Sequence, residues 1–429
     1  MKRTLVDDCF RPSQPRLRHC EAVEILKQAI ATRPAVVDVA LKDALGRVLA
    51  QDIAAIQPVP AHTNSAVDGY AFLASRQTRE HGVSLPVFGR ASAGHPLAKP
   101  ADINAASRIF TGAVVPAGLD TVVMQEDVQL AERDGTTMVS IPAGLKPGAN
   151  VRKSGEDVAA GATLYRTGNI MRPHDLAALA SIGRASIPCY DRLRVAIVST
   201  GDEVRDAGSG PLTPGQVYDA NTPMLSALAA LAGANVAQLG IWPDKRATVT
   251  ASLAAAAKDY DVILTSGGAS LGEEDHMAAA LSEIGKRHLW RIAIKPGRPM
   301  MFGQIRSGGS DSIVIGLPGN PVAVFVCFLM YVYPLLRAAG GAGWTEPRRF
   351  MLPAAFNFKD RKQGRREFWR GRIAQSATGM AVEKFARDGS GLISGLRWSD
   401  GLIDIPEDHG DIAIGDPVAF IPYSEFGIV

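Results

Sequence analysis

The sequence is poor in cysteine, and its few cysteines show no grouping. Only 4 occur among 429 residues. They form no Cys-x-x-Cys pair and no cysteine–histidine cluster with zinc spacing. Scattered cysteines are typical of a reducing compartment, and the first residues, MKRTLVDDCF, lack the apolar core of a secretory signal peptide. We therefore expect a cytoplasmic protein without structural zinc.

Long apolar runs and an excess of one charge are also lacking. The longest apolar run, residues 322–336, is shorter than the about 18–20 residues that span a bilayer, and Pro334 interrupts it. It predicts a buried helix and no membrane segment. The net charge is only +3, and the first twenty residues account for this excess. The absence of a basic stripe argues against a nucleic-acid partner.

Three fingerprints of common enzymes are missing. The chain has neither a P-loop nor a Gly-x-Gly-x-x-Gly motif, which argues against ATPase and dinucleotide-binding activities. Its 8 histidines are scattered, so nucleophilic hydrolysis has little support. Glycine, in contrast, is abundant: the 43 glycines make up about 10% of the chain, against a usual share of about 7%.

The length predicts two to four domains, and the residue pattern predicts an α/β plus β multidomain fold. Strands alternate with helices over 188–340, which indicates an open parallel or mixed sheet covered on both faces. Residues 53–148 predict a small, mostly β domain, and residues 345–429 a C-terminal β barrel. A short helix is expected at 43–50.

Glycine-rich loops follow several strands of the α/β region. The segments are TSGGASLGEED (265–275), GLPGNP (316–321) and STGDE (199–203). Ligands of such folds bind beyond the carboxyl ends of the strands, where free backbone N–H groups and helix N-termini favour anions. The loops thus predict a phosphate or oxyanion site. Glu273 and Glu274 are expected only to complement the helix dipole, while for Asp275 a ligand role stays equally open.

Charged turns extend this pattern. Lys295 and Arg298 flank a rigid Pro-Gly turn, a spacing that suits phosphate or a molybdate-like anion. The carboxylates of the STGDE segment could hold Mg²⁺ through oxygen, although this segment alone fits an ordinary turn. By spacing alone, NSAVDGYA (64–71) and GED (155–157) are β turns.

Taken together, the motifs resemble those of the molybdopterin molybdenumtransferases, the MoeA-type proteins, over about residues 20–425. The resemblance rests on segments that occur in the family's order: NSAVDGYA, TGAVVPAGLDTVVMQED, RKSGEDVAAGATLYRTG, STGDEV, DANTPML, TSGGASLGEED, IAIKPGRP, GLPGNPVAVF and GRREFWR.

The resemblance implies an elongated, four-domain homodimer. Residues 18–52 and 149–187 would form a discontinuous linker and dimerisation domain, and 188–340 the molybdopterin-binding domain. The implied reaction inserts molybdate into adenylylated molybdopterin, with Mg²⁺ present, and releases AMP. Implied partners are a molybdopterin adenylyltransferase and recipient molybdoenzymes. Two alternatives stay open: a non-catalytic molybdopterin-binding scaffold or carrier, and a pterin adenylyltransferase.

The glycine loops and the resemblance together give the expected site residues. The catalytic set, by resemblance, is Asp68, Thr111, Asp157, Glu203 and Asp275. The set expected to bind the pterin substrate is Thr200, Gly201, Asp202, Asp219, Ser266, Gly267, Gly268, Ser270, Gly272, Arg291, Lys295, Arg298, Pro318 and Gly319. The metal ligands would be Glu203, Asp244 and Asp275.

Some positions depart from the family pattern. Arg291 and Arg298 stand where lysine is frequent, and His62-Thr63 stands where Phe-Asp is common. Positive charge is kept at both arginines, but a guanidinium differs in shape from an ammonium group. In the family architecture, Asp68, Thr111 and Asp157 would face the α/β domain of the other subunit.

Overall fold

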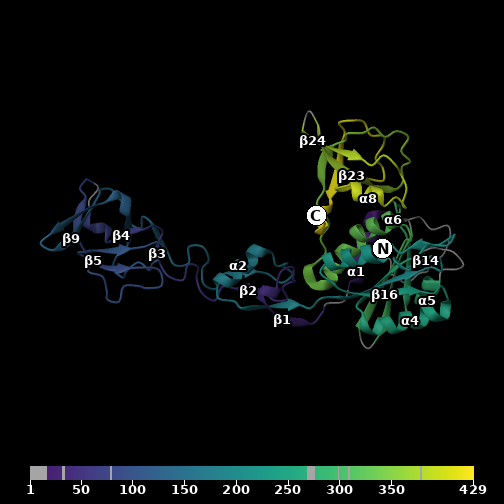
Figure 1. The fold of residues 1–429 in the computed structure, drawn as a ribbon, viewed down its shortest axis with the longest axis horizontal. Coiled ribbons are helices and arrows are strands. Elements are labelled where there is room, and N and C mark those ends of the chain that lie inside the picture. Colours follow the sequence, from purple (N-terminus) through teal and green to yellow (C-terminus); the bar gives the residue numbers. More distant parts are fainter. Residues whose placement is uncertain are drawn as a thin grey trace, which may run out of the picture.

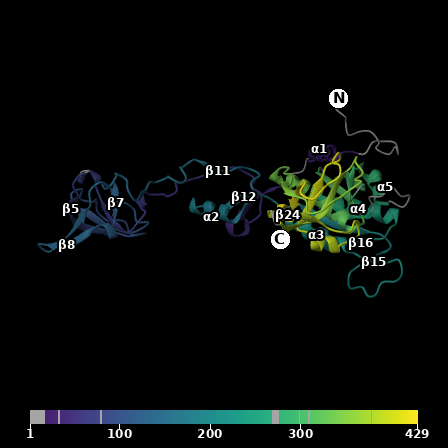
Figure 2. The same cartoon turned by 90° about the horizontal axis from the view of Figure 1, so that it is seen from above.

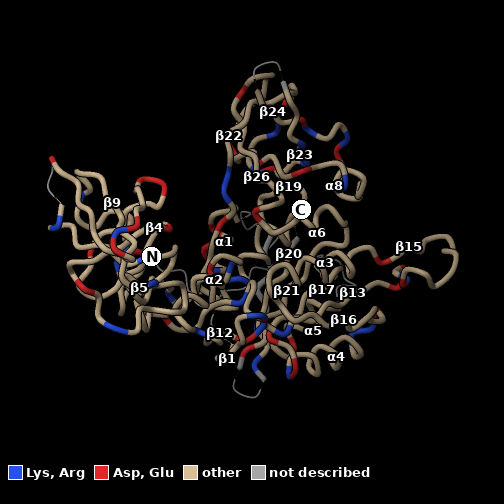
Figure 3. The backbone as a smooth tube through the Cα atoms, turned by 60° about the vertical axis from the view of Figure 1, so that its left-hand side comes forward, with Lys and Arg blue, Asp and Glu red and all other residues tan. Residues whose placement is uncertain are grey.

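The computed structural model shows an elongated molecule of four parts, three of them in a row and the fourth beside the last of these (Figure 1). A β domain at one end is joined through a slender linker to an α/β domain, and a C-terminal β domain lies against the latter (Figures 1 and 2). Blue and red segments are interspersed in every part (Figure 3). The structure describes residues 17–30, 34–77, 80–267, 276–297, 299–307, 310–376 and 379–429.

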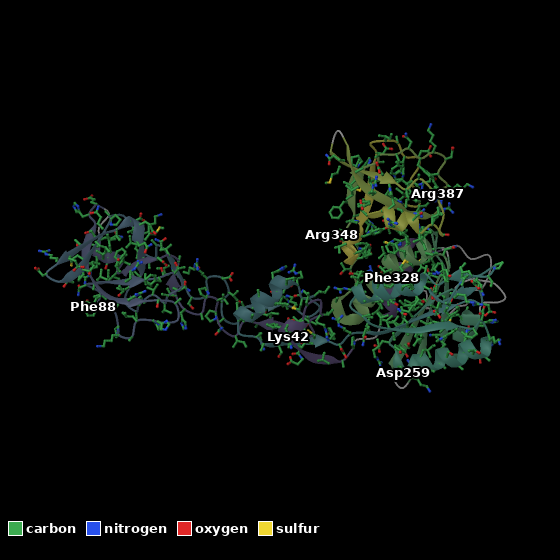
Figure 4. The ribbon with its side chains drawn as sticks, in the orientation of Figure 1. Lys42, Phe88, Asp259, Phe328, Arg348 and Arg387 are labelled. Atoms are coloured by element: carbon green, nitrogen blue, oxygen red, sulfur yellow. The ribbon has the colours of Figure 1, made fainter. Side chains whose placement is uncertain are left out.

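The distal β domain, which we call the arm, is built on a six-stranded sheet in the order β7-β4-β6-β5-β9-β8. Apolar clusters cover the sheet, one around Phe72 and Val139 and another around Ile109 and Val122. The labelled Phe88 of β5 lies far from Phe328 of the α/β domain (Figure 4). The elements are β4 (Gly69–Phe72), η2 (Ala74–Arg76), β5 (Val83–Ala91), β6 (Ala106–Ile109), β7 (Thr121–Met124), η3 (Gln125–Asp127), β8 (Gln129–Arg133) and β9 (Thr136–Ile141).

The linker consists of two chain segments that pair with each other. Two short antiparallel pairs, β1 with β12 and β2 with β11, hold them together near α2, and a third, β3 with β10, lies at the arm (Figure 1). The elements are β1 (Val36–Ala40), η1 (Leu41–Asp43), β2 (Ile53–Ala54), β3 (Asn64–Ser65), β10 (Val151–Arg152), β11 (Thr163–Tyr165), α2 (Pro173–Ser181) and β12 (Ser186–Tyr190).

One helix prediction for this region needs correction. The helix expected at 43–50 is wrong. Gly46 adopts a φ of 72°, and Val48 and Leu49 form β bridges with Ile170 and Cys189. Helix α1 (His19–Ala29) precedes the linker in sequence. Its residues Ala22, Val23 and Leu26 pack into the core of the α/β domain and not into that of the linker.

The α/β domain contains a mixed six-stranded sheet in the order β16-β13-β17-β21-β20-β18. Strands β16, β13, β17 and β21 are parallel, β20 runs antiparallel to β21, and the edge strand β18 pairs antiparallel with β20. One face is covered by α3 and the long apolar helix, the other by α4 and α5. The elements are β13 (Arg194–Thr200), β14 (Val204–Arg205), β15 (Val217–Tyr218), α3 (Asn221–Leu231), β16 (Asn235–Trp242), α4 (Arg246–Asp259), β17 (Val262–Ser266), α5 (His276–Ile284), β18 (Lys286–Arg291), β20 (Pro299–Ser307) and β21 (Ser310–Leu317).

The long apolar helix is a core element. Residues 321–342 are long and apolar enough to cross a membrane, with a mean hydropathy of 1.9 over an 18-residue window, but 83% of that window is buried inside the protein. The prediction of a buried helix is therefore confirmed. The helix consists of α6 (Pro321–Cys327), η4 (Phe328–Val332), α7 (Tyr333–Arg337) and η5 (Ala338–Ala342).

The C-terminal domain is a curled antiparallel sheet that one strand joins from outside. The N–H of Ala355 donates to the Val382 carbonyl at 2.8 Å, which closes the sheet into a small barrel. Strand β19 (Ile294–Lys295) pairs with β23, although its neighbours in sequence belong to the α/β domain. The remaining elements are β22 (Phe350–Pro353), β23 (Arg366–Ser376), β24 (Gly379–Lys384), α8 (Ser394–Trp398), β25 (Gly401–Ile405), β26 (Pro417–Pro422) and η6 (Tyr423–Phe426). The predicted α/β plus β multidomain fold is confirmed.

Candidate active site

The ends of three neighbouring parallel strands lie side by side. Ser266, the last residue of β17, is in register with Ser199 of β13 and with Leu317 of β21. Thr200 follows Ser199 directly, and Pro318 and Gly319 follow Leu317. The structure thus brings the three glycine-containing loops, far apart in sequence, to one edge of the sheet.

Two glycines allow this edge to close tightly. Gly267 has a φ of +87°, and a Cβ there would lie 2.9 Å from the Thr200 carbonyl oxygen. Gly201 has a φ of +137°, and a Cβ there would lie 2.6 Å from the Glu203 carboxylate, which folds back over this position. Both conformations favour glycine. At Gly267 the missing side chain lets this loop approach the loop of Thr200, and at Gly201 it leaves room for the Glu203 carboxylate of the same loop.

A buried amide that sequence reasoning missed joins the loops. Asn221, at the start of α3, is 8% exposed. Its Nδ2 donates to Ser266 Oγ and to the Gly319 carbonyl, both at 2.7 Å. Among the described residues, its Oδ1 is buried without a hydrogen-bond partner. The motif DANTPML contained this asparagine, but nothing in its spacing indicated which loops it would connect.

Asp219 fixes the start of the same helix. Its carboxylate accepts hydrogen bonds from the N–H groups of Asn221 and Thr222, both at 3.0 Å, and from the Thr222 hydroxyl at 2.7 Å. Burial alone would raise the pKa of Asp219, but hydrogen bonds, including one from Ser199, outweigh burial and lower it. The carboxylate is therefore charged at neutral pH, and both of its oxygens accept hydrogen bonds from the first residues of α3.

The remaining carboxylates at this edge lie in the open. Asp202 and Glu203 are exposed, and Asp202 Oδ1 accepts from the Asp244 N–H at 3.3 Å. Within the described part of the chain, no three His, Cys, Asp or Glu side chains gather as a metal site. Since Mg²⁺ often takes only one or two carboxylates together with substrate phosphates, this donor set still fits such an ion.

Some predicted site residues cannot be placed. Arg291 ends β18, and its side chain is not among those described. The other members of this group lie outside the described residues: Gly268, Ser270, Gly272, Asp275 and Arg298.

A cavity of about 340 Å³ lies where the α/β and C-terminal domains meet. We call it the junction cavity. The α/β domain contributes Lys295 with its Pro296-Gly297 turn, and Val322 at the start of α6. The C-terminal domain contributes three more cations and one carboxylate. They are Arg365, Arg370, Lys384 and Asp388. Of these residues, only Lys295 was expected, because no motif connected the C-terminal segment with the loops of the α/β domain.

Lys295 lies between two carboxylates of the C-terminal domain. Its Nζ is 3.6 Å from Glu367 Oε2 and 3.7 Å from Asp388 Oδ2. The first contact follows from the β19–β23 pairing, which places Lys295 beside Glu367. Strand pairing thus fixes the backbone of this lysine at the cavity wall.

The start of α6 connects the strand-end loops with the junction cavity. On one side the Gly319 carbonyl accepts from Asn221. On the other side the Val322 N–H donates to the Ser390 carbonyl at 2.9 Å. The two groups of polar residues therefore flank the first turn of one long helix, whose N-terminus favours an anion.

The remaining predicted residues lie in or beside the arm. Asp68 Oδ1 accepts from both the N–H and the hydroxyl of Thr111 at 2.7 Å, and these hydrogen bonds lower the pKa of Asp68. Asp157 is exposed, and its N–H donates to the Val59 carbonyl at 3.0 Å. Within one chain, the linker separates this group from the α/β domain (Figures 1 and 2).

Comparison with known proteins agrees with this architecture. Family models match the MoeA N-terminal region (domain I and II) at residues 17–183, a probable molybdopterin binding domain at 196–338, and the MoeA C-terminal region (domain IV) at 352–423. A molybdopterin molybdenumtransferase of Haemophilus influenzae is 36% identical over 386 residues, which cover 90% of this chain and 93% of that protein. The chain belongs to the MoeA family of molybdopterin molybdenumtransferases.

Other relatives support this assignment. Molybdopterin molybdenumtransferase 2 of Mycobacterium tuberculosis is 35% identical and covers 90% of this chain and 94% of its own length. The crystal structure of a molybdopterin biosynthesis MoeA protein from Pyrococcus horikoshii aligns with a TM-score of 0.80 at 26% identity, over 95% of this chain and 100% of that one. The MoeA fold thus extends over all four parts of the molecule.

Proposed function

We propose that this protein inserts molybdate into adenylylated molybdopterin and releases AMP, with Mg²⁺ present and as a homodimer. The observation that best supports the reaction is the junction cavity, because four cations converge there: Lys295, Arg365, Arg370 and Lys384. Such an array suits a tetrahedral oxyanion or a phosphate. The names of its relatives, molybdopterin molybdenumtransferase, support the choice of reaction.

Each group of residues has a distinct role in this proposal. The cations of the cavity bind and orient the oxyanion, and the strand-end loops at Thr200, Gly267 and Gly319 accommodate the phosphorylated pterin. Because the dithiolene of the pterin itself binds the metal, the protein needs no thiolate of its own. This agrees with the burial of Cys189 and Cys327 and the surface position of Cys20.

Mg²⁺ would be held by carboxylates at the sheet edge. The described candidates are the exposed Asp202 and Glu203 and the partly exposed Asp244, and Asp275 is a further one by family resemblance. When bound, the ion would neutralise charge on the substrate phosphates. The carboxylates themselves stay accessible, since the strong hydrogen bonds at this edge go to Asp219.

The dimer is part of the proposal because the arm is separate from the α/β domain of its own chain. We place Asp68, Thr111 and Asp157 of one subunit at the α/β domain of its partner, which completes each site from two chains. The fixed Asp68–Thr111 pair would then present an ionised carboxylate to substrate bound by the other chain.

Mixing two inactive variants tests this arrangement. Asp68→Ala and Lys295→Ala chains, each inactive alone, are co-expressed with different tags. If sites are shared, random pairing restores about one quarter of the wild-type rate, because half of the dimers are mixed and one of their two sites is intact. A mixture as inactive as its parts would contradict the shared site. Mixing Asp68→Ala with Asp157→Ala is the control without recovery, since both changes lie on the same side of the site.

The reaction itself is tested by AMP release from purified protein supplied with adenylylated molybdopterin, molybdate and Mg²⁺. Binding without AMP release would favour the scaffold or carrier alternative. Formation of adenylylated molybdopterin from ATP and molybdopterin would favour the adenylyltransferase alternative. In the proposed pathway, an adenylyltransferase supplies the substrate and cytoplasmic molybdoenzymes receive the product.

A further inference from the structure

The junction cavity contains the carboxylate of Asp388 among several cations that could bind an anionic ligand. Asp388 Oδ1 lies 2.8 Å from Lys384 Nζ, and Asp388 Oδ2 lies 3.7 Å from Lys295 Nζ. Each oxygen therefore contacts one lysine, one from each domain. A tetrahedral oxyanion bound at this place would use the same two ammonium groups.

Glu367 provides the second carboxylate beside Lys295, and it differs from Asp388 in burial and in its hydrogen-bond partners. Glu367 is 2% exposed, and its oxygens also accept from Trp369 Nε1 at 2.9 Å and from Arg365 Nε at 3.1 Å. A buried charge with this many partners is costly to move. Glu367 is therefore a fixed part of the wall that orients Lys295 and Arg365 whether or not an anion is bound.

Asp388, in contrast, lies in a loop, directly before Gly389, which adopts a φ of +144°. Its side chain is 47% exposed, against 3% for that of Glu367. Because water can replace the partners of an exposed carboxylate, its ion pairs are weak. Asp388 can leave the lysines at small cost, whereas Glu367 cannot.

Asp388 is nevertheless charged at neutral pH. Burial alone would raise its pKa, but Lys384, Lys295 and Arg370 outweigh burial and lower it. Arg370 also supports the loop that carries Asp388, by donating to the carbonyls of Arg387 and Leu392 at 2.8 and 3.1 Å. The loop thus holds an ionised carboxylate close to the lysines.

We propose that Asp388 is a built-in competitor for the oxyanion, occupying Lys295 and Lys384 until a doubly charged tetrahedral anion displaces it. The proposal rests on the proposed function, since it requires that the junction cavity binds the oxyanion. It makes Asp388 a residue that sets affinity and selectivity: an anion must outcompete one carboxylate for two ammonium groups. Singly charged anions would bind less well than doubly charged ones because of this competition.

The two carboxylates give predictions of opposite sign. Removing the competitor with Asp388→Asn should tighten the binding of molybdate alone to the full-length protein by about fivefold, the equilibrium effect of a partly exposed ion pair. Removing the fixed carboxylate with Glu367→Gln should weaken it, because Lys295 and Arg365 lose their orientation. Asp388→Glu, which keeps the charge, should stay within about twofold of wild type.

Isothermal titration calorimetry with molybdate at low salt measures these affinities, and steady-state kinetics adds a second readout. In Asp388→Asn the KM for molybdate should fall without a matching rise in kcat. Unchanged or weaker molybdate binding in Asp388→Asn would overturn the proposal, and Asp388→Ser repeats the test with a second neutral side chain.

Lys295→Ala separates this inference from the proposed function. If Lys295→Ala binds molybdate as well as the wild type does, the junction cavity is not the oxyanion site, and the proposed function fails at this point. If Lys295→Ala loses molybdate binding but Asp388→Asn does not bind molybdate more tightly, the junction cavity is still the oxyanion site, and only the role of Asp388 is wrong.

Discussion

Replacing Asn221 by alanine should loosen the strand-end loops without disturbing the rest of the fold. The amide makes two hydrogen bonds of 2.7 Å, to Ser266 Oγ and to the Gly319 carbonyl. Each contributes about 1 kcal/mol, and partners left unpaired in a buried place add to the loss, so we expect about 2–3 kcal/mol. This corresponds to an about 30- to 140-fold change in the local opening equilibrium.

Hydrogen exchange followed by mass spectrometry measures this change where it occurs. Peptides covering residues 262–267 and 313–319 should exchange faster by that factor in Asn221→Ala, while peptides of the arm should not change. Asn235→Ala is the matched control, because Asn235 is exposed at the start of β16 and should change stability by at most about 0.5 kcal/mol. Equal exchange of the two variants at these peptides would refute the role assigned to Asn221.

Two further predictions concern a glycine and a buried ion pair. Gly267→Ala should lower stability by more than the about 1–2 kcal/mol of left-handed strain, because its Cβ would also meet Thr200. Gly240→Ala, with similar φ but no atom within 4 Å, should show the strain alone, and equal melting points would contradict this. Asp404 is fully buried and pairs with Arg366 at 2.6 Å. Burial would raise its pKa, but arginine contacts lower it overall. The pair therefore stabilises the fold above the unfolded carboxyl pKa of about 3.9 and less as pH falls below it. Asp404→Asn should cost about 3–5 kcal/mol at pH 7, and urea titrations should show a smaller gap from wild type at pH 3; a gap independent of pH would contradict the assignment.

The sequence pattern was sufficient to predict the strands of the α/β domain and where they end, because local periodicity and glycine-rich loops coincide there. The strand predicted before Gly201 and the one before Gly267 both form and end at these loops. The helix predicted at 43–50 failed because Val48 and Leu49 pair with residues more than a hundred positions away. Such pairings override local preference, and no local signal reports them.

The junction cavity escaped prediction for a similar reason. Lys295 was expected from its Pro-Gly turn. Arg370 belongs to the GRREFWR motif but was given no role in the site, and Asp388 lies outside the motifs that were recognised. Their approach depends on the two-residue strand β19 joining β23. A strand this short has no periodicity of its own, so its choice of sheet is set by the packing of two whole domains.

The same strand has a consequence for how this molecule can be divided. A cut after the long apolar helix would separate two domains that look independent along the sequence. It would also leave β19 as an unpaired edge and Lys295 without Glu367, exposing backbone groups that invite aggregation. The α/β domain therefore cannot be separated cleanly from the C-terminal domain, and fragments for crystallography or binding studies should keep residues 188–429 in one piece.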